Sequence, residues 1–70
     1  MKMKQDYINS RARELAESWV NGNLKSVRRD IVDAPKYRTD AIALALNVLL
    51  ILQETDDHGA EYFVQTIGDP

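Results

Sequence analysis

Residues 41–52 read AIALALNVLLIL, the longest apolar run in this 70-residue chain, and Asn47 is its one polar member. The alternation of alanine with larger residues at its start could also belong to a β-strand. Alanine and leucine, however, are strong helix formers, and alanine is depleted in strands. The run is also shorter than the roughly 20 residues that a membrane-spanning helix needs. We therefore predict a buried helix that begins between residues 35 and 40 and ends near Gln53 or Glu54.

Apolar residues recur at intervals of three and four positions in three further segments, which is the pattern of a helix with one buried face. The segments are about 4–20, with Ile8, Ala12, Leu15, Ala16 and Trp19; about 24–32, with Leu24, Val27 and Ile31; and about 58–67, with Ala60, Phe63, Val64 and Ile67. We therefore predict two helices before the apolar run and one after it.

Turn-forming residues separate these segments. Gly22 can close the first helix in the left-handed conformation, and Asn23 can cap the second. Pro35 ends the second helix, because the residue before a proline avoids helical geometry. The apolar helix has two alternative starts: either Pro35 lies in its first turn, or Thr39 is its N-cap.

These segments predict a single all-α domain over residues 1–70: a small, compact bundle of about four helices around a central apolar helix. A chain this short buries only about 60% of the surface that its unfolded form exposes, so its core is marginal. It has no cysteine, so neither disulfides nor thiolate metal sites can stabilise it. A helix that is apolar nearly all round must be covered nearly all round. Either the other helices enclose it, or a second copy of the chain covers the remaining side, and we expect such a homodimer.

Two apolar stripes run along the central helix. One holds Ile42, Ala45, Leu46, Leu49 and Leu52, and the other holds Leu44, Val48 and Ile51. We expect the second stripe to mediate self-association together with Asn47, because a polar residue within an apolar seam can fix the register of a helix pair. The predicted self-association residues are Leu44, Asn47, Val48 and Ile51.

Side chains suited to catalysis are scarce. The chain has one histidine and no cysteine, and none of its serines lies in a triad-like context. The sequence Asp56-Asp57-His58 is best interpreted as a capping turn for the last helix, where acidic residues favour the positive end of the helix dipole. We therefore predict no enzyme, no catalytic residue, no metal site and no cofactor.

The charges divide unevenly along the chain. Residues 21–38 carry five basic side chains against two acidic ones, whereas residues 39–70 carry six acidic side chains and no lysine or arginine. Such a division suits electrostatic recognition or antiparallel self-pairing. We expect a partner protein to bind the basic stretch and its aromatic neighbours, or else the acidic C-terminal helix. The predicted partner-binding residues are Trp19, Lys25, Arg28, Arg29, Lys36, Tyr37 and Arg38.

Trp19 has two interpretations, as a lid on the core or as an anchor in an interface, where tryptophan is enriched. The basic stretch also leaves open a second function, a helix-turn-helix-like DNA-binding regulator that uses residues 24–32. The overall acidic balance and the acids Asp30 and Asp33 argue against it. Nucleic acid is therefore the less favoured partner.

The segment from Arg13 to Asn23, followed by Val27 and Ile31, resembles small uncharacterised helical proteins of phages, plasmids and other mobile elements. Such proteins often act by binding a host protein or another protein of the same element. The resemblance therefore implies a non-enzymatic interaction protein, an accessory or inhibitor factor, and the apolar central helix adds the expectation that it acts as a homodimer. It assigns no functional residue. No signal peptide is visible, so we expect a soluble, cytoplasmic protein without membrane association.

Overall fold

The computed structural model describes residues 4–68, apart from the side chain of Asp57, and every regular element within them is a helix. The helices are α1 (Gln5–Val20), α2 (Leu24–Val32), α3 (Arg38–Thr55) and α4 (Asp57–Gly68). The predicted all-α class and the compact four-helix bundle are therefore confirmed.

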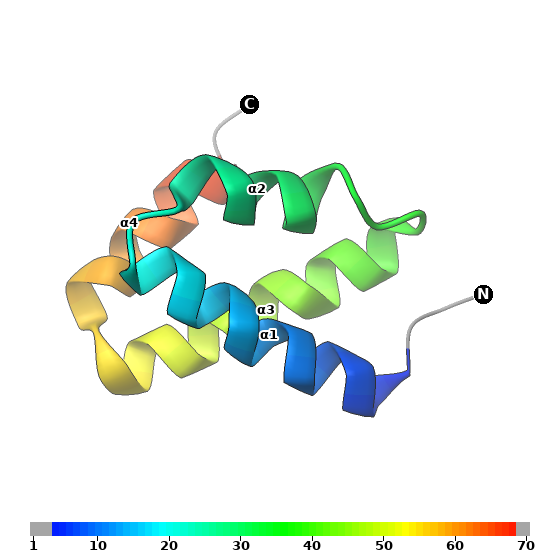
Figure 1. Ribbon diagram of the computed structural model, residues 1–70, viewed down its shortest axis with the longest axis horizontal. Coiled ribbons are helices and arrows are strands. Elements are labelled where there is room, and N and C mark those ends of the chain that lie inside the picture. Colours follow the sequence, from blue (N-terminus) through cyan, green and yellow to red (C-terminus); the bar gives the residue numbers. More distant parts are fainter. Residues whose placement is uncertain (1–3, 69–70) are drawn as a thin grey trace.

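The helices lie in two layers, with α1 and α2 in front of α3 and α4 in the view of Figure 1. Helix α3 contacts all three other helices and packs most extensively against α1. The molecule measures 33 × 26 × 16 Å, and its shortest dimension leaves room for only two layers of helices. Each helix therefore has an outer side with no further layer behind it.

A glycine ends α1, as the sequence predicts. Gly22 has φ of 90°, and the backbone N–H groups of Gly22 and Asn23 donate to the carbonyls of Trp19 and Ser18, both at 3.0 Å. This is the Schellman arrangement, which satisfies carbonyls at the end of a helix. Asn23 occupies the N-cap position of α2, but its side chain makes no capping hydrogen bond.

The connections on either side of α3 follow local rules. Helix α2 ends before Pro35, and Tyr37 in extended conformation is the N-cap of α3, so the helix begins one residue before Thr39, the N-cap candidate from the sequence. At the other end, the backbone N–H of Gly59 donates to Asp56 Oδ1 at 3.1 Å. Asp56 is thus the cap of α4, one of the two aspartates that the sequence offered for it.

The core draws on all four helices. Its members are Ile8, Ala12, Leu15, Ala16, Trp19, Val27, Ile31, Leu44, Val48, Leu52, Ala60 and Phe63. The rings of Trp19 and Phe63 meet edge to face with centroids 5.2 Å apart, an arrangement that aromatic pairs prefer. This contact joins the C-terminal end of α1 to α4, the first helix to the last.

Replacing Phe63 by alanine tests this closure. We expect Phe63→Ala to lower the free energy of unfolding by about 3–5 kcal/mol, because it leaves a large cavity in the core. That is about half of the roughly 4–10 kcal/mol expected of a domain this size. Trp19, the only tryptophan, gives the fluorescence signal for urea unfolding. The neighbouring Val64→Ala is the control, since Val64 is half exposed; equal losses in both variants would contradict the assignment of Phe63 to the core.

Candidate interaction surface

The structure buries Leu44 and Val48 of the stripe expected to self-associate and exposes Ile42 and Leu46 of the other stripe, whose Leu52 is buried. Leu44 and Val48 are 1% and 0% exposed and lie in the core of a single chain, so their assignment to a self-association surface is wrong. Ile51 is half-buried and packs against the same core. Asn47 donates its side-chain amide to the carbonyl of Ala43 at 2.7 Å, so its hydrogen bond is made within its own helix. Leu44 and Val48 lie in the core that all four helices form, which explains why they are not available to a second copy.

The outer side of α3 carries the exposed apolar residues. Ile42, Leu46 and Leu50 are 50%, 54% and 60% exposed. Each is four positions from the next, and Leu46 is two positions from both Leu44 and Val48, which places the three on the side of the helix opposite the core. We call Ile42, Leu46, Leu50, the adjoining Leu49 of α3 and Val64 of α4 the apolar face. Leu49 and Val64 line one shallow groove between their helices.

Charged side chains flank the two ends of the apolar face. Lys36 and Arg38 are exposed at the N-terminal end of α3. At the C-terminal end, Glu54 is exposed on α3, and Glu61 of α4 lines the same groove as Leu49. We call these pairs the basic end and the acidic end. The apolar face is therefore bounded by opposite charges.

A second depression lies beside the basic end. It has a volume of about 490 Å³ and is lined by Ile31, Val32, Pro35, Tyr37, Arg38, Ala41, Ile42, Ala45 and Ile67. The Lys36 ammonium lies 5.9 Å from the centroid of the Tyr37 ring, within range of a cation–π contact. Of the predicted partner-binding residues, the fold gathers Lys36, Tyr37 and Arg38 at this place.

The other predicted partner-binding residues lie elsewhere. Trp19 is 4% exposed and packs against Phe63 and Tyr62, whose ring centroid is 5.8 Å away. Its interpretation as an interface anchor is therefore wrong, and it belongs to the core. Lys25 and Arg29 are exposed on α2, and Arg28 is half-buried there and engaged in interactions within the chain.

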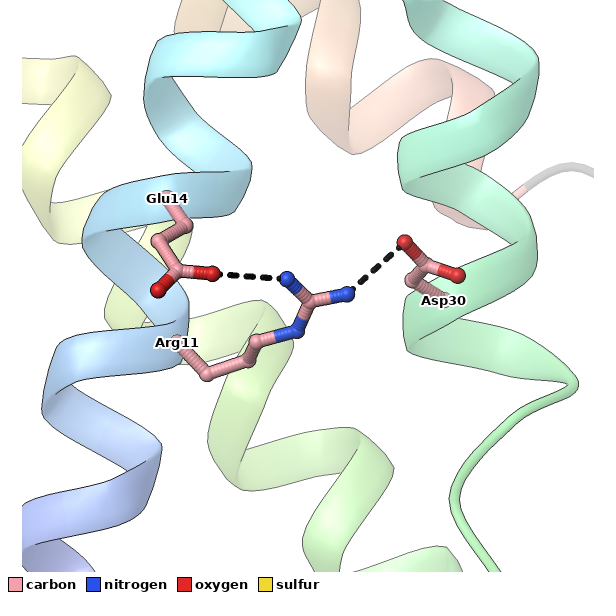
Figure 2. Close-up of polar contacts among 3 residues, drawn as sticks. All are labelled: Arg11, Glu14 and Asp30. Atoms are coloured by element: carbon pink, nitrogen blue, oxygen red, sulfur yellow. Dashed lines mark hydrogen bonds and ion pairs between the residues drawn. The ribbon is translucent and has the colours of Figure 1, made fainter.

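An arginine on α1 neutralises part of α2. Figure 2 shows the Arg11 guanidinium between two carboxylates, with Nη1 2.8 Å from Glu14 Oε2 and Nη2 2.9 Å from Asp30 Oδ2. The Arg11 side chain is about two-thirds buried and the Asp30 side chain about three-quarters buried. The bridge therefore fixes α2 against α1 and removes one acid from the free charge of α2.

Arg11→Gln should lower the free energy of unfolding by about 1 kcal/mol at low salt. A partly buried ion pair contributes more to stability than a fully exposed one. The loss should shrink as salt screens the charges. Arg13→Gln is the matched control, since Arg13 is exposed on the same helix and makes no ion pair with another described residue. Chemical denaturation by urea, which leaves ionic strength unchanged, measures both variants. Identical stabilities for the two would contradict the structural role of the bridge.

Neither a metal cluster nor a membrane span is present in the described part of the chain. Among the side chains placed in residues 4–68, no three histidine or acidic groups gather as metal ligands would. None of the described helices is long and apolar enough to cross a membrane. His58 is exposed at the start of α4 and lines the groove that contains Glu61.

Comparison of the chain with family models, with curated proteins and with solved structures finds no match. Sequence reasoning missed the residues of the apolar face, although one signal could have found them. The polar residues at the two ends of α3, Thr39 and Gln53, fall on the same side of a helix as Leu46. A stripe that ends in polar residues is better suited to the surface than to the core.

Proposed function

We propose that the chain is a non-enzymatic protein-interaction module that self-associates through the apolar face. The observation that carries the proposal is the half-exposed state of Ile42, Leu46 and Leu50 on one side of α3. Single exposed apolar residues are normal on a protein surface, but a contiguous apolar stripe with a charged rim is typical of an interaction site. The occupant that we propose is a second copy of the chain.

The size of the apolar face sets the expected affinity. One helix with a single neighbouring side chain provides an interface at the small end of specific protein contacts, and such interfaces bind weakly. Association must also offset the loss of rotational and translational freedom. We therefore expect a dimer that dissociates in the micromolar range, where oligomeric state changes with concentration.

Leu46→Gln should shift the monomer–dimer equilibrium toward monomer by at least about tenfold, because the substitution places an amide at the centre of the apolar face. Glutamine keeps the helix propensity close to that of leucine. Since Leu46 is more than half exposed, stability of the monomer should change by less than about 0.5 kcal/mol. Analytical ultracentrifugation over a micromolar concentration series measures the equilibrium.

The matched control is Tyr7→Gln. Tyr7 is exposed to nearly the same degree as Leu46, but it lies one turn before Arg11, on the side of α1 that faces α2. This variant should dimerise as the wild type does. A wild-type chain that stays monomeric at every concentration would refute the proposed self-association.

DNA binding through α2 is the alternative, and the surface of that helix favours it less. Lys25 and Arg29 are its exposed cations, while Asp33 is exposed at its C-terminal end. Non-specific DNA affinity rises with the number of phosphates that basic side chains neutralise. Two cations beside an exposed acid provide little of that attraction.

We expect no binding of a random-sequence DNA duplex at about 50 mM salt, a concentration at which phosphate contacts would still be strong. Fluorescence anisotropy of a labelled duplex, with protein in the tens of micromolar range, makes the measurement. Binding that falls steeply with salt and is weakened by Arg29→Gln would support the DNA-binding alternative instead. The control is Arg13→Gln on α1, which should leave such binding unchanged.

The biological setting that we propose is that of an accessory or inhibitor protein of a mobile element. It is supported by the resemblance of residues 13–23 to proteins of that group. A partner protein, in this proposal, contacts the depression beside Tyr37 and takes the place of the second copy at the basic end. An acidic segment with an apolar anchor is the chemistry that would fit there, since Lys36 and Arg38 border an apolar depression.

A further inference from the structure

We infer that two copies pair antiparallel along α3, with the two-fold axis passing beside Leu46. This inference rests on the proposed self-association and specifies its geometry. A two-fold interface uses the same surface on both copies. In an antiparallel helix pair, a residue that lies a given number of positions before the axis in one copy therefore faces the residue that lies the same number of positions after the axis in the other copy. The order of residues on the apolar face decides whether such a pairing is favourable.

The apolar residues are spaced evenly about Leu46. Ile42 lies four positions before it and Leu50 four positions after it, about 6 Å along the helix in each direction. In the antiparallel pairing, Ile42 of each copy therefore faces Leu50 of the other, and the half-exposed surfaces of both become buried.

The charged ends favour the same direction. Arg38 lies eight positions before Leu46 and Glu54 eight positions after it, about 12 Å on either side of the axis. An antiparallel pair therefore places the basic end of each copy at the same axial level as the acidic end of the other, at both ends of the interface, with Arg38 on the flank of α3 toward α2 and Glu54 on the flank toward α1. A parallel pair would place like charges together at both ends, which is unfavourable.

The charges at both ends are available for this pairing. Neither Arg38 nor Glu54 makes an ion pair with another residue that the structure describes. Nor does the sequence from residue 39 onward contain a lysine or arginine to neutralise the acidic end from its own segment. Arg13 of α1 lines the groove beside Glu54 but forms no ion pair with it. Opposed helix dipoles add a small favourable contribution in the antiparallel direction.

Single cysteines test the direction and the register. The chain has no cysteine, so each variant carries one thiol and can form only intermolecular disulfides. We prepare Leu46→Cys, Ile42→Cys and Leu50→Cys, oxidise each at concentrations above the wild-type dissociation constant, and follow crosslinking by non-reducing electrophoresis. A disulfide forms readily only where the two Cα atoms come within about 7 Å.

The expected result is a self-crosslinked Leu46→Cys dimer, with little self-crosslinking of Ile42→Cys or Leu50→Cys alone. A mixture of the last two should yield a mixed dimer at least about tenfold faster than either forms its own. Rapid self-crosslinking of Ile42→Cys and Leu50→Cys would show a parallel pair and overturn the inference. A wild-type chain that dimerises while no variant crosslinks would overturn it as well. If the wild type is monomeric throughout, the proposed self-association fails first, and the two failures are thereby distinguished.

Charge reversal gives an independent measurement. One variant carries Lys36→Glu with Arg38→Glu, and the other carries Glu54→Lys with Glu61→Lys. Each alone should dimerise at least about fivefold more weakly than the wild type, because reversal places like charges together at both ends. An equimolar mixture should regain wild-type affinity as a heterodimer. Wild-type affinity in each variant alone would show that the ends do not face one another and would overturn the antiparallel arrangement.

Discussion

A helix that is apolar on every side is fully buried from solvent only if other helices surround it. A 70-residue chain has too few helices to do so. Helix α3 contacts α1, α2 and α4, and it buries Leu44, Val48 and Leu52 between them. The fold is two layers thick, so no other helix of residues 4–68 lies behind α3. The half-exposed Ile42, Leu46 and Leu50 are the direct consequence of this constraint.

The remaining parts of the bundle serve to place helices against α3. The Schellman turn at Gly22 reverses the chain after α1 and brings α2 alongside it, where Arg11 holds Asp30. At the far end, the contact of Trp19 with Phe63 joins α1 to α4. The turn acts locally, whereas the Arg11–Asp30 bridge and the Trp19–Phe63 contact join residues far apart in the sequence, and together they support a small domain that has no disulfide.

The uneven charge distribution takes on a spatial meaning once the helices are placed. Along the sequence it separates a basic middle segment from an acidic C-terminal segment. In the fold, the boundary between these segments coincides with the start of α3, so the two signs lie at opposite ends of one exposed apolar face. That arrangement gives the face a direction, which an apolar stripe by itself would not have.

The sequence by itself determined the helical class, the four segments and the residues that end them, because periodicity, Gly22, Pro35 and Asp56 act through short-range geometry. It also placed the start of the central helix between residues 35 and 40 and its end near Gln53 or Glu54, close to the observed Arg38–Thr55. The apolar pattern alone did not decide which side of that helix faces inward, because both stripes are apolar; only Thr39 and Gln53, at the two ends of the Leu46 side, indicate in the sequence that this side is exposed. The positions of α1 and α4 in the tertiary structure decided that Leu44 and Val48 are core and that Leu46 is surface. They likewise made Trp19 a core residue, since its burial depends on Phe63, far along the chain.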